Sequence, residues 1–354
     1  MPFCYSCFMR RIIFVSQPLG PVGEGKGGGV ESTLLSLAAG LESRGHSVTV
    51  VAPRGSRVPS IKCIEVDGNY PENLLNTGSV NSVSISDESV LSGMWKAVAE
   101  IEKDHDLVIN FAYDFLGFYL SHFLSIPIFH VLSLPSCSAM IDKEIDSILE
   151  KRPGTIGVHS RSQADSYRFA SKLRIIGNGV DTDVFRFQES AGKAFLYVGR
   201  ISPEKQIEHA LEAARKLKQP LRIIGRVQDQ DYFRRLKEDY EDLDYGGFLS
   251  ADALVEELGR ARAVLITSSA AETYCLAAAE AQACGVPVVA YAKGSLHEVV
   301  DPNRTGYLVE PDNVEALSEA LLKTDILDRK NCRDFASKKL SLKSFVDRVE
   351  AWIN

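Results

Sequence analysis

The strongest constraint on the fold of this chain is a repeated alternation of short apolar runs with amphipathic helical segments. An apolar run at 11–16 is followed by a helical pattern of apolar residues at 30–41 and by a second apolar run at 47–52. Strands that alternate with helices predict βαβ units, in which the strands lie parallel and helices cover the sheet. We therefore expect a doubly wound α/β domain at the start of the chain.

The same alternation returns after a turn-rich connector at 178–187, which predicts a second domain of the same class. The predicted domains are 1–187 and 188–343, and an amphipathic helix at 344–354 is expected to complete the first. Further strands are expected at 107–111, 126–131, 155–159, 194–198, 221–224, 263–267 and 286–291, and helices at 207–217, 232–241 and 272–283. Ligands bind such sheets at the carboxyl ends of the strands, so we expect the two domains to face each other across a cleft that holds the site.

Composition excludes several classes of protein. Hydrophobic residues make up 45% of the 354 residues and charged residues 25%, as in ordinary globular proteins. The net charge of -7 argues against sequence-independent nucleic-acid binding. No apolar run reaches the roughly 18–20 residues of a membrane span and no signal peptide is evident, so we expect a cytoplasmic protein without integral membrane contact.

The seven cysteines are scattered along the chain, which does not suit a disulfide framework and favours a reducing compartment. Cys4 and Cys7 form a C-x-x-C pair, but no second pair completes a zinc site. We interpret residues 1–8 as an upstream-start extension or a tail.

A glycine-rich segment follows the first expected strand. Gly23, Gly25 and Gly28 have the spacing of the dinucleotide-binding fingerprint, although no acidic residue ends the second strand. Arg54 stands near that position and could bind a 2′-phosphate, so an NADP-dependent oxidoreductase stays open as an alternative. Even without such a cofactor, a glycine-rich turn that opens onto a helix N-terminus exposes backbone N–H groups to an anion or a sugar.

Two cations follow the first strand of the second block. Arg200 and Lys205 lie in the turn 199–205, about one helical turn apart. Two cations at the carboxyl end of a strand can clamp a diphosphate and offset the charge on a departing phosphate. This turn is therefore our candidate for phosphate binding.

Two carboxylates surround the start of the expected helix at 272–283. Glu272 falls at the strand-to-helix turn, and Glu280 follows eight residues later. One of them can reach sugar hydroxyls while the other reaches a ribose. The N-terminal amides of the helix, around Leu276 and Ala277, would face the phosphates.

Two short acidic strings resemble metal-binding D-x-D motifs. Asp181 and Asp183 lie in the connector, and Asp229 and Asp231 precede an expected helix. We interpret both pairs as turn and helix-cap residues, because these side chains accept hydrogen bonds from nearby backbone N–H groups. No metal is expected.

Together these motifs resemble the retaining glycosyltransferases of family 4, which have the GT-B fold of two Rossmann-like domains. The resemblance rests on Gly27-Gly28-Gly29, on the turn 199–205, on Glu272 with Glu280, and on the segment 285–290. A finer resemblance, to pteridine glucosyltransferases, covers nearly all of residues 10–354. It rests on the segments 14–16, 20–23, 27–31, 110–114, 153–160 and 327–329.

This resemblance implies that UDP-glucose binds mainly to the second domain. Arg200, Lys205, Glu272 and His130 would form the catalytic set, with the two cations on the diphosphate, Glu272 on the glucose hydroxyls and His130 beside the donor sugar. The remaining donor contacts would come from Gly28, Gly29, Phe248, Leu249, Leu276, Ala277 and Glu280, with Glu280 on the ribose and the backbone near Phe248 and Leu249 on the uracil.

The resemblance also implies the acceptor, a side-chain hydroxyl of tetrahydrobiopterin or a related reduced pterin. Asn110, Tyr113 and Asp114 are the acceptor candidates, with Tyr113 stacking on the pterin and Asp114 pairing with its amino group. Transfer would retain the anomeric configuration without a metal or cofactor, the leaving diphosphate taking the proton of the acceptor. A family 4 enzyme with a lipid, polysaccharide or small-sugar acceptor stays open.

One position departs from the family pattern. The family commonly has glycine where this chain has Cys275. We expect this side chain to narrow the sugar pocket or redirect the loop that precedes the helix.

Overall fold

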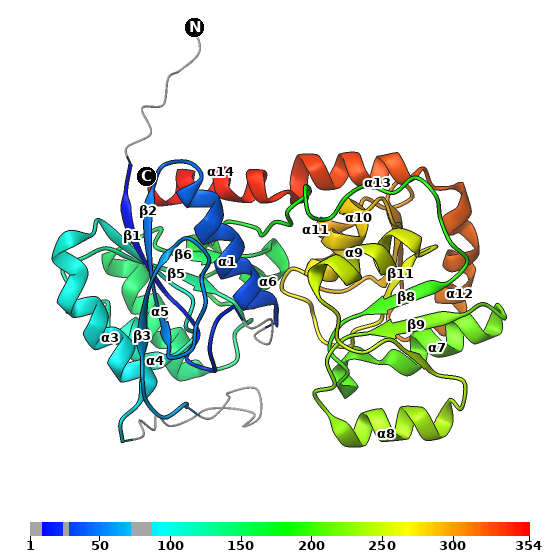
Figure 1. Cartoon of the computed structure of the whole chain (residues 1–354), viewed down its shortest axis with the longest axis horizontal. Coiled ribbons are helices and arrows are strands. Elements are labelled where there is room, and N and C mark those ends of the chain that lie inside the picture. Colours follow the sequence, from blue (N-terminus) through cyan, green and yellow to red (C-terminus); the bar gives the residue numbers. More distant parts are fainter. Residues whose placement is uncertain (1–8, 24–27, 72–86) are drawn as a thin grey trace, which may run out of the picture. The chain divides into compact units, whose positions relative to one another are not determined.

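The computed structural model describes residues 9–23, 28–71 and 87–354, which form two compact units (Figure 1). One unit comprises the chain up to Gly177 together with Val346–Asn354, and the other comprises Asn178–Phe345. The predicted boundary at 187/188 therefore lies ten residues too far along the chain. The connector belongs to the second unit because Phe185 packs against the core of that unit and the Gln188 N–H donates to the Cys284 carbonyl.

The first unit is built on a seven-stranded parallel sheet of order β3-β2-β1-β4-β5-β6-β7. Its strands are β1 (Arg11–Val15), β2 (Ser47–Pro53), β3 (Lys62–Val66), β4 (Leu107–Asn110), β5 (Ile128–Leu132), β6 (Ile156–Val158) and β7 (Arg174–Ile175). Its helices are α1 (Gly28–Glu42), α3 (Val90–Ile101), α4 (Phe115–Leu120), α5 (Ala139–Lys151) and α6 (Arg161–Asp165), joined by the end of α14 (Leu342–Ile353). Residues 12–15 have no exposed area, because helices cover both faces of the sheet.

The second unit has a six-stranded parallel sheet of order β10-β9-β8-β11-β12-β13. Its strands are β8 (Phe195–Val198), β9 (Leu221–Ile224), β10 (Asp244–Tyr245), β11 (Val264–Ile266), β12 (Val288–Tyr291) and β13 (Gly306–Val309). Its helices are α7 (Ile207–Lys216), α8 (Gln230–Asp239), α9 (Ala251–Arg260), α10 (Leu276–Ala283), α11 (Leu296–Val299), α12 (Val314–Leu322) and α13 (Arg329–Phe335).

Short helical turns complete the two units. They are η1 (Glu102–Asp104), η2 (Ala170–Lys172), η3 (Pro203–Lys205), η4 (Lys323–Ile326) and the π-helical η5 (Ala336–Leu340). No helix in the described ranges is both long enough and apolar enough to span a bilayer.

The predicted class of two doubly wound α/β domains is confirmed. The sequence analysis did not anticipate β3, β7, β10 and β13, of which β7 and β10 are only two residues long and β3 is partly exposed at an edge. Such edge strands lack the continuous apolar run by which buried parallel strands are recognised.

The strand order reverses at one place in each sheet, and this positions the candidate residues. In the second unit β8 lies between β9 and β11, with Leu196 in register with Val264. The connections after β8 and β11 run to opposite sides, so the loops at the carboxyl ends of these two strands flank a crevice. The first sheet has the same reversal between β1 and β4.

Candidate active site

The loop after β8 begins with a close approach of two backbones. A Cβ atom on Gly225 would lie 1.7 Å from the Gly199 carbonyl oxygen, so only glycine fits there. Arg200 follows with its side chain 46% exposed, within 3.4 Å of the Glu204 carboxylate and hydrogen-bonded to Gln228. Its guanidinium is thus held at the surface of the loop, where an anionic ligand can reach it.

Lys205 and Glu272 form the central pair of the site. The Lys205 ammonium lies 2.5 Å from Glu272 Oε1, and the two side chains are only 15% and 18% exposed. Burial raises the pKa of Glu272, but the charge and hydrogen bond of Lys205, with a hydrogen bond from Ser268, outweigh it and hold the pKa below its ordinary value. Glu272 is therefore ionised at neutral pH and can accept hydrogen bonds from a ligand.

The two carboxylate oxygens of Glu272 are unequal. Lys205 Nζ and Ser268 Oγ both donate to Oε1, at 2.5 and 2.6 Å. Among the described residues no donor is hydrogen-bonded to Oε2. One oxygen is thus held by the protein while the other can accept a ligand hydroxyl.

Glu280 is the fifth residue of α10 and is partly buried. Burial raises its pKa to about 7. Its carboxylate makes no hydrogen bond to another residue of the described ranges, so the protein leaves it desolvated and without a donor. A polar group in this state gains when a ligand hydroxyl supplies the missing hydrogen bond.

Cys275 directly precedes α10 in a left-handed conformation, with φ of 67° and ψ of 72°. A residue other than glycine is strained in this region. Burial and the nearby Glu272 carboxylate raise the pKa of the thiol, so it is not an activated nucleophile. The thiol thus lies close to the Glu272 and Glu280 carboxylates, and its effect on the sugar pocket stays a prediction.

The other predicted donor-binding residues of the second unit lie on loops and helix ends. Leu276 and Ala277 are partly buried in the first turn of α10. Phe248 is 60% exposed, and Leu249 packs against the core in the loop between β10 and α9. These placements leave the predicted contacts to phosphate and uracil as predictions.

The glycine segment belongs to the first unit. Gly28 and Gly29 open α1, and Gly28 has a φ of 69° that favours glycine. The predictions that involve Gly25 and Gly27, like those for Cys4 and Cys7, lie outside the described residues. At the end of β2, Arg54 forms an ion pair with Asp67, so the 2′-phosphate ligand proposed for an NADP enzyme would have to displace a carboxylate.

His130, which is predicted to lie beside the donor sugar, lies in the core of the first unit. His130 has no exposed area, and it is hydrogen-bonded to Asn110 Nδ2 at 3.0 Å and Ser121 Oγ at 2.8 Å. Burial lowers its pKa to about 3, so the imidazole is neutral. His130 is a core residue that joins β5 to β4 and α4.

Asn110, which is predicted to bind the acceptor, is also buried and supports a turn. It is 1% exposed, and its amide group closes a turn by accepting from the Ala112 N–H and donating to the Ala112 carbonyl, each at 3.0 Å. This turn presents Tyr113 and Asp114 at the carboxyl end of β4. In the structure, Asn110 holds the backbone of the loop that carries Tyr113 and Asp114.

Tyr113 is buried in the core of the first unit, whereas Asp114 is partly exposed. Tyr113 is 8% exposed, and its hydroxyl oxygen lies 3.7 Å from the Cys137 thiol. Asp114 caps α4 by accepting from the Leu116 N–H at 2.9 Å through one carboxylate oxygen. Burial raises the pKa of Asp114.

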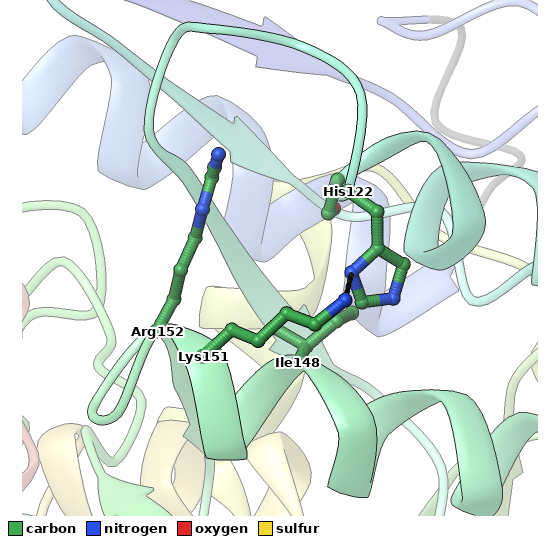
Figure 2. Close-up of a pocket in the computed structure, with 5 residues that line it drawn as sticks. His122, Ile148, Lys151 and Arg152 are labelled. Carbon is green, nitrogen blue, oxygen red and sulfur yellow. Dashed lines mark hydrogen bonds between the residues drawn. The ribbon is translucent and has the colours of Figure 1, made fainter.

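A small cavity of about 100 Å³ lies in the first unit (Figure 2). It is lined by Ser121, His122, Ile148, Lys151 and Arg152. These residues precede β5 and β6, so the cavity lies toward the amino ends of the strands. Figure 2 shows Lys151 reaching His122, and Arg152 donates to the carbonyls of residues 124 and 126. The two cations of the cavity, Lys151 and Arg152, are thus hydrogen-bonded to other groups of the protein.

The two D-x-D strings are turn and cap residues, as predicted. Asp181 accepts from the Asp183 N–H at 2.8 Å, and Asp229 caps α8 by accepting from the Tyr232 N–H at 2.8 Å. Across 9–23, 28–71 and 87–354, no group of three or more His, Cys, Asp or Glu side chains could hold a metal ion.

The sequence analysis missed the hydroxyl groups that follow β11. Thr267 donates to the Lys205 carbonyl at 2.9 Å, and Ser268 donates to Glu272 at 2.6 Å. Ser269 donates to the Glu204 carbonyl through its N–H at 2.8 Å. The sequence feature that could have predicted these contacts is the run of three hydroxyl residues directly after a strand that lies at the sheet reversal.

Residues 181–339 match the family model described as Glycosyl transferases group 1. A curated relative, D-inositol 3-phosphate glycosyltransferase of Acidothermus cellulolyticus, is 31% identical over 167 residues, which cover 39% of this chain and 37% of that protein. The chain spans 17% of the length of another curated relative.

Solved structures resemble the whole chain. Sucrose-phosphate synthase from Thermosynechococcus elongatus has a TM-score of 0.78 at 20% identity and covers 96% of this chain and 97% of its own. Anabaena Alr3699/HepE in complex with UDP has a TM-score of 0.76 at 17% identity, with 97% and 99% covered. This chain therefore has the GT-B fold, and its second unit matches the glycosyl transferases group 1 family.

Proposed function

We propose that this chain is a retaining glycosyltransferase that moves glucose from UDP-glucose to a side-chain hydroxyl of tetrahydrobiopterin or a related reduced pterin. The observation that carries the proposal is the Lys205–Glu272 pair, in which a cation for phosphate and a carboxylate for sugar hydroxyls meet at the carboxyl ends of β8 and β11. The solved Anabaena Alr3699/HepE complexes with UDP and with UDP-glucose support this choice of donor.

Each polar group of the second unit has a role in this proposal. Arg200 and Lys205 bind the diphosphate and offset the charge that develops as the bond between glucose C1 and phosphate oxygen breaks. Glu272 accepts sugar hydroxyls through Oε2, and Glu280 accepts ribose hydroxyls. Each cation is expected to lower the activation free energy of transfer by about 3–4 kcal/mol, by comparison with the loss of rate when an oxyanion donor is removed.

Retention requires the new bond on the face that the diphosphate leaves. The acceptor oxygen bonds to C1 while the C1–phosphate bond breaks, and the departing diphosphate takes the acceptor proton. The chain needs no enzyme nucleophile in this scheme. It holds the diphosphate close to C1 until the acceptor arrives.

The acceptor proposal rests on the loop after β4. Asp114 uses one carboxylate oxygen as a helix cap, and the other oxygen accepts no hydrogen bond from any residue within the described part of the chain. This second oxygen can pair with the amino group of a pterin, and the buried ring of Tyr113 would have to become accessible for the pterin to stack on it. A family 4 enzyme with another acceptor shares the same donor site and is the second candidate.

The test combines purified protein, UDP-glucose and tetrahydrobiopterin under anaerobic, reducing conditions with EDTA. We expect UDP release together with a pterin heavier by one hexose, and loss of both with Lys205→Met. UDP release without a pterin product would move the acceptor to another class. No UDP release with any acceptor, together with tight NADPH binding, would support the oxidoreductase.

A further inference from the structure

Three consecutive hydroxyl residues follow β11 and divide their contacts between backbone and side chains. Thr267 and Ser269 hold the backbone of 204–205, at 2.9 Å from Thr267 Oγ1 to the Lys205 carbonyl and 3.1 Å from Ser269 Oγ to the Glu204 carbonyl. Ser268 instead contacts the two charged side chains of the site. Ser268 thus contacts side chains, whereas Thr267 and Ser269 contact the backbone.

Ser268 is 4% exposed and lies against both members of the central ion pair. Its Oγ is 2.6 Å from Glu272 Oε1 and 3.4 Å from Lys205 Nζ. A hydroxyl can donate one hydrogen bond and still accept others. Ser268 therefore donates to the carboxylate while its oxygen faces the ammonium.

The free protein neutralises Glu272 with Lys205, but the proposed donor requires Lys205 for its diphosphate. A partly buried carboxylate that loses its cation is strongly destabilised unless other donors satisfy it. Ser268 is the only other side chain of the described residues that donates to Glu272. Its hydrogen bond to Glu272 does not depend on Lys205, so it can be kept when Lys205 binds phosphate.

We propose that Ser268 is a positioning residue, which holds Oε1 of Glu272 so that Oε2 faces the sugar hydroxyls of the bound donor. This inference rests on the proposed donor site and adds the residue that keeps its carboxylate oriented. Binding then exchanges one ion pair for two ligand contacts, since Lys205 gains the diphosphate and Glu272 gains the sugar. The hydroxyl bond persists through the exchange.

The proposal predicts an effect on sugar binding that is separate from nucleotide binding. The measured quantity is the ratio of the Kd for UDP to the Kd for UDP-glucose, obtained by calorimetry, which reports the contribution of the sugar and needs no acceptor. Ser268→Ala is expected to lower this ratio about tenfold, the effect of losing a hydrogen bond to a charged group. The Kd for UDP itself is expected to change less than about twofold.

A double-mutant cycle shows whether Ser268 acts through Glu272. We expect Glu272→Gln to lower the ratio and Ser268→Ala to add no further loss in that background. Ser318→Ala is the matched control, because Ser318 is a buried hydroxyl in α12 that donates to the Val314 carbonyl at 2.9 Å and contacts no residue of the site. It is expected to leave the ratio unchanged.

The possible outcomes separate this inference from the proposed function. If the wild-type ratio exceeds one but Ser268→Ala leaves it unchanged, or if the two substitutions lower it independently, the positioning role is overturned and the donor proposal stands. If the wild-type protein binds neither UDP nor UDP-glucose, the donor proposal fails and the inference fails with it. A tenfold loss that vanishes in the Glu272→Gln background supports both.

Discussion

The Lys205 ammonium and the Glu272 carboxylate lie 2.5 Å apart although 67 positions separate them in the sequence. They follow β8 and β11, which are neighbours in the sheet because the strand order reverses between them. The two charges neutralise each other in the free protein, in a place where both are mostly shielded from water. A ligand that carries a diphosphate and a sugar offers a partner to each.

Lys205→Met is expected to lower the rate of UDP release by about 10²–10³, since it removes a cation from the developing charge. It should also lower the free energy of unfolding by about 1–3 kcal/mol, because Glu272 keeps its charge without a counterion. Lys193→Met, which removes an exposed lysine of the same unit, is the control for general charge effects. A loss of less than tenfold would remove Lys205 from the catalytic set.

The Lys205–Glu272 pair also predicts a dependence of stability on pH. The folded protein holds the pKa of Glu272 below its ordinary value of 4.5. The stabilisation is therefore complete above about pH 4.5 and is lost as the pH falls through the folded pKa. Thermal melts below pH 5 should show a shallower fall for Lys205→Met than for the wild type, and identical slopes would contradict the pairing.

Glu280 is expected to give stability a dependence on pH opposite to that of Glu272, and Glu280→Gln removes it. Burial raises the pKa of Glu280 from 4.5 to about 7, so the folded state binds more protons than the unfolded state between these values. Stability from this group therefore falls as the pH rises from about 4.5 to about 7. Melting temperatures measured across this range should fall less steeply for Glu280→Gln than for the wild type. Glu319→Gln, in an exposed position of α12, should follow the wild type.

Two substitutions of Cys275 isolate the effect of its backbone conformation. Cys275→Ala keeps the Cβ atom in the left-handed region, whereas Cys275→Gly removes it. We expect the glycine variant to be more stable than the alanine variant by about 1 kcal/mol in chemical unfolding, since the strain of a side chain there exceeds the entropic cost of glycine. Greater stability of the alanine variant would show that the strain is absent. Comparing UDP-glucose with other UDP-sugars in both variants then tests whether this side chain narrows the sugar pocket.

His130→Leu is expected to reduce stability and not catalysis. It removes the partner of Asn110 and Ser121 in the core, which should lower the free energy of unfolding by about 1–3 kcal/mol. The folded pKa of about 3 lies below the ordinary 6.5, so the wild type loses stability as the pH falls from about 6.5 toward 3, and this loss should diminish in the variant. The exposed His297 provides the control substitution. A large fall in kcat with an unchanged melting temperature would instead support a role for His130 at the donor site.

Sequence patterns predicted the arrangement of the second unit because two simple rules apply to it. Buried parallel strands give continuous apolar runs, and the loops after the strands at a sheet reversal converge. Arg200, Lys205 and Glu272 follow such strands, so their loops could be expected at one crevice before the structure was known. The structure brings Lys205 and Glu272 of these loops within 2.5 Å of each other, and their roles toward a ligand stay predictions.

The same rules did not show that His130 and Asn110 are buried. Both lie at or near the carboxyl ends of central strands, where helices cover the two faces of the sheet. In such strands the alternation of side chains does not distinguish a solvent face from a core face. Their mutual hydrogen bond became apparent only once β4 and β5 were placed side by side.

The sequence by itself determined the two α/β domains, the loops that bear charged residues and the likeness to family 4, because these follow from local periodicity and from short motifs. Only the tertiary structure decided that the first unit ends at Gly177 and that Cys275 has a left-handed backbone conformation. It also decided that Ser268 and Lys205 both donate to the same oxygen of Glu272. Each of these depends on contacts between segments distant in the chain, and no local pattern specifies the distance between two loops. The orientation of a single carboxylate is set by such contacts, and here they leave its second oxygen open to a ligand.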